Sequence, residues 1–245
     1  MKQRIKISDV QLGYKKSGQI VQVLKDLNLT FDASQLVGIV GLNGVGKSTL
    51  LKSIAGLLPL LKGEILIDGI EVNDDAYVVL AKKVAVVLTE KFGGFNLTVS
   101  DVVQAGMMPY TNALNQLNAE QIKVVEEAIK LCGLQHHQHR FLEELSDGYF
   151  QRTVIAKALA QQTDVILLDE PTAFLDYAAK HDLLIMLKRL CEEAQKCILI
   201  SSHDLDLLLK YCHKLLVITE DDICCIPVEE AKTNEAFKQI AKGYL

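Results

Sequence analysis

The chain has 245 residues, of which 49% are hydrophobic and 23% are charged. This is the composition of a globular domain, and it excludes a disordered, collagen-like or disulfide-stapled chain. Lys and Arg total 26 and Asp and Glu total 31, so the formal net charge is −5. A dedicated nucleic-acid binder is therefore disfavoured, and we expect no nucleic-acid partner.

The sequence shows no pattern typical of a membrane span, a secretory signal or a metal site. No apolar run approaches the roughly 20 residues that span a bilayer, so we expect no direct membrane span. The charged start of the chain is not followed by an apolar stretch, which predicts a cytoplasmic protein without a secretory signal. The six cysteines lack CxxC spacing and are interpreted as reduced, packing thiols. The histidine cluster at 136–139 is interpreted as a solvated or packed loop, because no acid or cysteine completes a ligand set.

The first third of the chain is rich in predicted strands. Nearly alternating apolar residues predict strands at 4–10, 20–24 and 27–31, with a loop containing Gly13 after the first. The continuous apolar run 35–40 predicts a strand that is buried on both faces, as in the parallel sheet of an α/β core.

The middle of the chain contains two more predicted strands and then a helical region. A hairpin strand is predicted at 63–67 and a buried strand at 84–88, and the pattern of apolar residues predicts helices from 98 to 163. Within that region Asn118 and Gln121 form a capping pattern, and a helix with apolar residues at helical spacing ends at Gly133.

The last third returns to alternating strands and helices. Strands are predicted at 165–168, 197–201 and 215–219, and amphipathic helices at 177–195 and 205–210. The residues after 221 match no motif, although 228–240 has an amphipathic pattern. The order of elements predicts an α/β fold with a β-rich start and a helical insertion.

The most informative motif is GLNGVGKS at 41–48, which fits the phosphate-binding pattern G-x-x-x-x-G-K-[ST] between a strand and a helix. Its glycines let the backbone curl so that N–H groups point at phosphate oxygens, and the helix start adds its dipole. Lys47 would reach the β- and γ-phosphates, and the hydroxyl of Ser48 would ligate Mg²⁺. The predicted phosphate-binding residues are Gly41, Asn43, Gly44, Gly46, Lys47, Ser48 and Thr49.

Two carboxylates follow the buried run 165–168. A parallel strand that ends in acids places them where α/β proteins bind ligands. We expect Asp169 to hold the Mg²⁺ shell and Glu170 to orient or deprotonate the attacking water. Together with the phosphate loop, these acids make nucleotide hydrolysis with Mg²⁺ the leading interpretation.

The segment LSDGYFQR at 145–152 resembles the signature of the ABC ATPases, which usually reads LSGGQ-x-Q-R. Asp147 replaces the first glycine and Tyr149 replaces the glutamine. The resemblance implies that Ser146 and the N–H of Gly148 donate to the γ-phosphate held by the other subunit of a head-to-tail homodimer, the ATP sandwich.

Further positions match the family in the right order. The resemblance implies that Tyr14, predicted in the loop after the first strand, stacks on adenine. Asp176 matches the loop that contacts the partner subunit, and His203 matches the switch histidine at the γ-phosphate. Most members carry a glutamine after the strand at 84–88 that touches Mg²⁺ and water. Thr89 is the equivalent here, which predicts slowed but surviving activity.

The stretch 96–111 is similar to the subgroup that imports ferric siderophores, haem and cobalamin, although Met107 replaces an arginine of that pattern. This resemblance implies a single ABC ATPase domain over 1–245. A β subdomain plus a RecA-like P-loop NTPase core would occupy about 1–97 and 164–220. An inserted helical subdomain with the signature would occupy 98–163, and a C-terminal appendage 221–245.

The resemblance also implies partners and a location. Hydrolysis would energise separate transmembrane permease subunits, docked in a groove formed by the helical subdomain, at the inner face of the plasma membrane. The departures at Thr89, Asp147 and Tyr149 leave an alternative open. In that alternative, the chain is a soluble ABC-type clamp or assembly factor, for instance in iron–sulfur assembly, without a transport partner.

Overall fold

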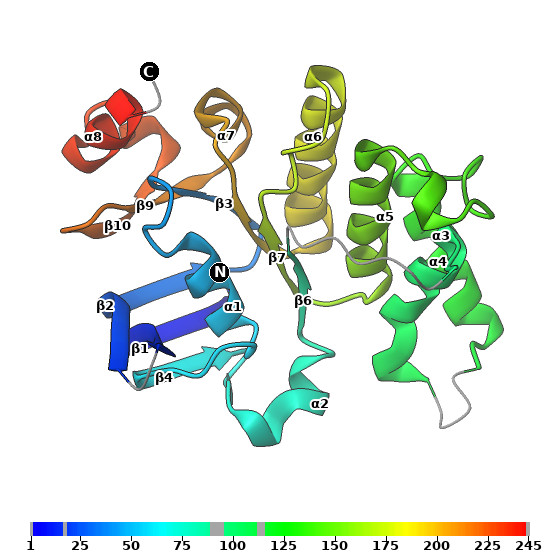
Figure 1. Cartoon of the computed structure of the whole chain (residues 1–245), viewed down its shortest axis with the longest axis horizontal. Coiled ribbons are helices and arrows are strands. Elements are labelled where there is room, and N and C mark those ends of the chain that lie inside the picture. The colour runs from blue at the N-terminus through cyan, green and yellow to red at the C-terminus, as the bar shows by residue number, and fades with distance from the viewer. Residues whose placement is uncertain (1, 17–18, 89–95, 112–115, 244–245) are drawn as a thin grey trace.

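A computed structural model describes residues 2–16, 19–88, 96–111 and 116–243 (Figure 1). The chain forms a four-stranded and a six-stranded β-sheet, with helices around the larger one and the smaller one at lower left in Figure 1. No helix in the described part of the chain combines the length and the apolar composition that a bilayer span requires.

The N-terminal sheet is antiparallel, with the strand order β2-β1-β4-β5. Its strands are β1 (Gln3–Lys16), β2 (Gln19–Asp32), β4 (Lys62–Ile67) and β5 (Ile70–Glu71). The predicted hairpin strand at 63–67 is therefore confirmed. β1 and β2 are long and pair along most of their length, from Gln3 opposite Asp32 to Lys16 opposite Gln19.

Two details of this sheet differ from the prediction. The loop predicted around Gly13 is wrong, because Gly13 lies within β1 and opposes Gln22. A Cβ at Gly13 would lie 2.3 Å from the carbonyl oxygen of Val21, so the glycine permits close backbone approach rather than a turn. The predicted strands 20–24 and 27–31 are one strand, β2, interrupted by an irregularity at Asp26 with φ 53°. Such a bulge shifts the alternation of side chains without ending the strand.

The core sheet has the order β10-β9-β3-β8-β7-β6, and every pair except β10 with β9 is parallel. The strands predicted within this sheet are confirmed to within one or two residues. Because the parallel strands run in one direction, their carboxyl ends share one edge of the sheet. The strands are β3 (Gln35–Val40), β6 (Val84–Val87), β7 (Val165–Asp169), β8 (Cys197–Ser201), β9 (Lys214–Ile218) and β10 (Ile223–Pro227).

Helices cover the core sheet and extend from it. The α-helices are α1 (Lys47–Ile54), α2 (Tyr77–Leu80), α3 (Val99–Gln104), α4 (Ala119–Leu131), α5 (Asp147–Ala160), α6 (Tyr177–Ala194), α7 (Leu205–Tyr211) and α8 (Glu235–Gly243). Short 3-10 helices are η1 (Asp74–Ala76), η2 (Ala105–Tyr110), η3 (Leu142–Glu144) and η4 (Val228–Glu230).

The capping pattern predicted before α4 is confirmed, since Asn118 and Gln121 exchange side-chain and backbone hydrogen bonds at 2.9 Å. Helices α3, α4 and α5 lie together at one end of the molecule, beside α6 (Figure 1).

Two apolar clusters hold the layers together. The N-terminal sheet and α1 pack on one face of the core sheet, where Val37 and Ile39 of β3 are fully buried. The helices α5 to α8 pack against the other cluster, which contains Leu36 and Val40 of the same strand. β3 is thus apolar on both faces, as its continuous run predicted.

The last residues are packed into the molecule. β10 adds an antiparallel edge strand to the core sheet, and Phe237 and Ile240 of α8 are 5% and 2% exposed in the core cluster. The segment described from 221 to 243 therefore contributes side chains to the core.

Candidate active site

The loop at 41–46 leaves the carboxyl end of β3 and enters α1. Gly44 and Gly46 have φ of 81° and 111°, in the region that other residues rarely adopt. A Cβ at Gly41 would lie 2.6 Å from the carbonyl oxygen of Ile218 on β9. The loop therefore needs its glycines for backbone shape and for close packing against the sheet.

Lys47 begins α1 and is 7% exposed. Its Nζ donates to the carbonyl oxygens of Gly41 at 2.6 Å and Leu42 at 3.2 Å, so the loop curls around the ammonium group. Burial lowers the pKa of Lys47, and the nearby carboxylates of Glu170 and Asp169 oppose that shift. The site thus holds a buried cation beside two acids.

Asp169 ends β7 and is oriented by a residue that the sequence interpretation did not single out. Ser201 ends β8 directly opposite Asp169 in the parallel register, and its Oγ donates to Asp169 Oδ1 at 2.7 Å. The same Oγ accepts the backbone N–H of Glu170 at 2.9 Å. Ser201 is completely buried. The available signal was the polar pair that follows the apolar run of β8.

Glu170 and His203 face each other across the edge of the sheet. His203 Nε2 lies 3.1 Å from Glu170 Oε1, and Glu170 adopts a φ of 50°. Burial raises the pKa of Glu170 to about 7, although the positive charge of Lys47 acts to lower it. Burial and the charge of Lys47 lower the pKa of His203, so the imidazole is neutral at pH 7. A carboxyl with a pKa near 7 suits a general base.

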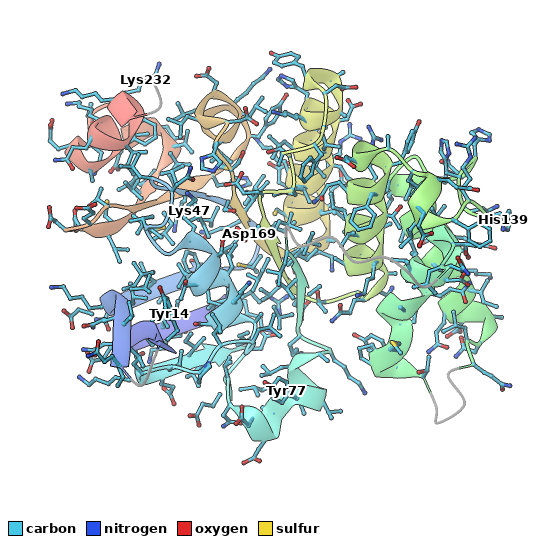
Figure 2. The ribbon with its side chains drawn as sticks, viewed as in Figure 1. Tyr14, Lys47, Tyr77, His139, Asp169 and Lys232 are labelled. Carbon is cyan, nitrogen blue, oxygen red and sulfur yellow. The ribbon has the colours of Figure 1, made fainter. Side chains whose placement is uncertain are left out.

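These groups line one cavity of about 250 Å³, which we call the nucleotide pocket. Figure 2 shows Lys47 and Asp169 close together at the centre of the molecule, one entering from α1 and the other from β7. The nucleotide pocket is lined by Asn43, Gly44, Gly46, Lys47, Ser48, Thr49, Asp169, Glu170 and His203.

Tyr14 lies elsewhere than the prediction placed it. It is part of β1, opposite Val21 of β2, and not in a loop, because the strand pairing continues to Lys16. Its side chain is 45% exposed on the N-terminal sheet (Figure 2). Val23 of β2 packs closely against Gly46 of the phosphate loop. A Cβ at Gly46 would lie 2.7 Å from Val23 Cγ1.

The predicted signature residues are brought together, but not with the nucleotide pocket of the same chain. Ser146 and Gly148 lie at the start of α5 and line a separate cavity of about 450 Å³, the signature pocket. The two pockets share no residue. The signature pocket is lined by Gly133, Ser146, Asp147, Gly148, Tyr149, Arg152, Phe174, Leu175, Asp176 and Ala179.

Thr89 was expected to take the place of the glutamine that touches Mg²⁺. It lies outside the described residues. Within the described ranges, no three His, Cys, Asp or Glu side chains gather into a group that could hold a metal ion.

Comparison with known proteins defines the family. The model of the family described as "ABC transporter" matches residues 24–173, which is more than half of the chain. The fold, the phosphate loop and the acids at the sheet edge agree with it. The chain therefore belongs to the ABC transporter family, and it is an ATP-binding ATPase of that family.

Individual relatives extend the likeness over most of the chain. A probable siderophore transport system ATP-binding protein of Bacillus subtilis is 36% identical, over 89% of this chain and 78% of its own length. A cobalamin import ATP-binding protein of Halobacterium salinarum is 34% identical, over 81% of this chain and half of its own length. A dimeric ATP-binding cassette in a post-hydrolysis state, bound to ADP and phosphate, superposes with a TM-score of 0.81 at 28% identity, over 91% of this chain and 98% of that one.

Proposed function

We propose that this chain is the ATP-hydrolysing subunit of an importer for an iron chelate, such as a ferric siderophore or haem, or for cobalamin. The assembled nucleotide pocket supports the ATPase role, because the buried cation, the two acids and the histidine surround one cavity. The siderophore and cobalamin import subunits among its relatives support the cargo class. They favour transport over a clamp or assembly factor.

In the proposed chemistry, the residues of the phosphate loop and the start of α1 cradle the phosphates, and Tyr14 stacks on the adenine. These loop and helix residues are Gly41, Asn43, Gly44, Gly46, Lys47, Ser48 and Thr49. Lys47 binds the β- and γ-phosphates, Glu170 acts on the attacking water and His203 contacts the γ-phosphate. Mg²⁺ fits this pocket. Ser48 and Asp169 both line it, and Asp169 Oδ1 is oriented by Ser201, which suits a hard cation that takes few protein ligands.

The proposed working form is a head-to-tail homodimer. Ser146 and Gly148 of one copy would meet the nucleotide held by the other, because the two pockets of one chain are separate. A Cβ at Gly148 would lie 3.5 Å from the carbonyl oxygen of Phe174, an ordinary contact. The chain's own packing therefore does not require a glycine there, which is consistent with close approach by an external ligand.

The proposed permease groove lies between the core and the helical segment 98–163, on the side of α2. It is a cavity of about 220 Å³ lined by Ala55, Leu57, Tyr77, Leu80, Ala81, Val84, Val86, Lys157, Ala158 and Gln161. Leu57 and Tyr77 are half exposed there, and Val78 on the same short helix is 75% exposed. Exposed apolar side chains beside a groove are typical of a surface that receives a partner. Occupancy of this groove would hold the chain at the inner face of the membrane.

One pair of measurements tests the proposal. A Glu170→Gln protein should bind ATP, hydrolyse it at least a hundredfold more slowly and accumulate as a dimer in size-exclusion chromatography. The wild-type chain should co-purify with a polytopic membrane protein from detergent extracts of its own cells. Normal turnover by the variant would overturn the role of Glu170, and absence of a membrane partner would overturn transport.

A further inference from the structure

Two buried hydroxyl groups join the loops that carry Glu170 and His203. Thr172 lies in the loop after β7 and Ser202 in the loop after β8, and each residue is 1% exposed. Thr172 Oγ1 and Ser202 Oγ are hydrogen-bonded at 3.0 Å. The backbone pairing of β7 with β8 ends at Asp169. The hydroxyl pair therefore connects the two loops beyond the point at which the strands stop pairing.

The ring of His203 depends on the backbone of its loop for its position. The side chain of His203 is 44% exposed, whereas the side chain of Glu170, which it faces at 3.1 Å, is 16% exposed. Packing therefore restrains the imidazole less than it restrains the carboxyl. Ser202 directly precedes His203, and Ser202 Oγ also accepts the N–H of Asp204 at 3.1 Å. This hydroxyl therefore holds the short turn on which His203 lies.

A second contact joins the same two parts of the chain. Lys180 Nζ of α6 donates to Asp204 Oδ2 at 2.8 Å, and the two side chains are partly exposed. A partly exposed ion pair contributes little, because water screens it. The buried hydroxyl pair is the stronger restraint, because neither hydroxyl has water as an alternative partner when the bond is lost.

We infer that Thr172 and Ser202 are positioning residues for ATP hydrolysis, which hold the imidazole of His203 against Glu170 in the geometry that the reaction requires. Neither of the two residues lines the nucleotide pocket, so they act through His203 and not on the nucleotide. A displacement of about 1 Å in an active site costs on the order of a hundredfold in rate. This inference rests on the proposed function, because that function gives His203 its contact with the γ-phosphate.

Steady-state ATPase assays on the full chain test this role. We expect Thr172→Val and Ser202→Ala each to lower kcat about tenfold, with KM for ATP unchanged within about twofold, because the phosphate-loop residues are not altered. The double variant should lose no more than Ser202→Ala does, because both substitutions remove the same hydrogen bond. Thr172→Ser keeps a hydroxyl and should retain about half or more of the wild-type kcat.

The matched control is Thr163→Val, at the other end of β7. Thr163 is also 1% exposed, and its Oγ1 donates to Val165 O at 2.8 Å. Both valine variants lose one buried hydrogen bond, so both should lose thermal stability to a similar degree. Only Thr172→Val should lower kcat. Equal kcat values of the two valine variants would overturn the inference, because a merely structural role does not distinguish the two ends of the strand.

The ring signal of His203 in NMR spectra gives a measurement that does not depend on activity. In histidine-labelled protein without nucleotide, this signal is assigned by its loss in His203→Ala. It should move in Thr172→Val and Ser202→Ala and stay in place in Thr163→Val. An unmoved signal in all three variants would overturn the inference and leave the proposed function standing. If His203→Ala hydrolyses ATP at the wild-type rate, the proposed role of His203 fails and the inference fails with it.

Discussion

The carboxyl of Glu170 makes the stability of the folded chain depend on pH. Burial raises its pKa from 4.5 to about 7, so the folded chain holds this proton more tightly than the unfolded chain does. The resulting stabilisation is complete below pH 4.5 and is lost as pH rises through 7. Above that pH the folded state carries a buried carboxylate.

Glu170→Gln should therefore become more stable than the wild type as pH rises from 4.5 to 8, by up to about 3 kcal/mol. Urea unfolding at several pH values measures the difference. Glu126→Gln, at an exposed position of α4, controls for the loss of one carboxyl. If the difference in the free energy of unfolding between Glu170→Gln and the wild type were the same at all pH values, burial would not shift the pKa of the Glu170 carboxyl.

Ser201 is the second residue with a defined effect. Ser201→Ala removes the donor to Asp169 and the acceptor for Glu170 N–H. We expect kcat to fall by roughly 10- to 100-fold and the free energy of unfolding to drop by about 1–3 kcal/mol. Steady-state ATPase assays and urea unfolding measure both. Ser53→Ala is the matched control, because Ser53 is buried and its hydroxyl has no partner among the described residues. Equal effects of the two substitutions would contradict the role of Ser201.

At the scale of elements, the side chain of Gln161, the residue after α5, bonds the end of this helix to the core. Gln161 Nε2 donates to the carbonyl oxygens of Ala81 at 2.7 Å and Val84 at 3.1 Å, just before and at the start of β6. Tyr110 Oη donates to Gln161 O at 3.0 Å, and Gln121 Nε2 donates to Tyr110 O at 3.1 Å. These bonds connect α4, η2 and α5 to β6 beside the proposed permease groove.

Gln161→Ala should loosen this joint, because two carbonyl oxygens lose their donor. We expect about 1–2 kcal/mol lower stability and faster amide hydrogen exchange in α3, α4 and α5. Gln104→Ala is the control, since among the described residues the side chain of Gln104 bonds only Ser100, on the exposed face of its own helix. Unchanged exchange in the three helices would show that packing alone holds them to the core.

At the scale of the whole molecule, α8 closes the fold near the phosphate loop. Phe237 and Ile240 are buried against the core, and a Cβ at Gly243 would lie 2.8 Å from Leu42 Cδ2. The end of the described chain thus touches the loop that begins the site. The strand β10 connects α8 to β9, the neighbour of β3 in the core sheet.

Phe237→Ala should lower the free energy of unfolding by about 3 kcal/mol, because it leaves a cavity in the core cluster. Because α8 contacts Leu42, we also expect a severalfold weaker affinity for ATP. Thermal unfolding and nucleotide titration measure the two effects. Lys238→Ala, at the next and exposed position, should change neither. Full stability of Phe237→Ala would mean that α8 is not part of the cooperative core.

Local patterns in the sequence predicted the phosphate loop, the acids at the end of β7, the parallel strands of the core sheet and the family, because these depend on neighbouring residues. Register and burial depend on residues far apart, and only the tertiary structure decided them. It joined 20–24 and 27–31 into one strand, put Tyr14 on β1 and packed α8 against the core. It also placed Ser201 opposite Asp169 and buried Glu170 enough to raise its pKa, because parallel pairing brings together strand ends that lie some 30 residues apart.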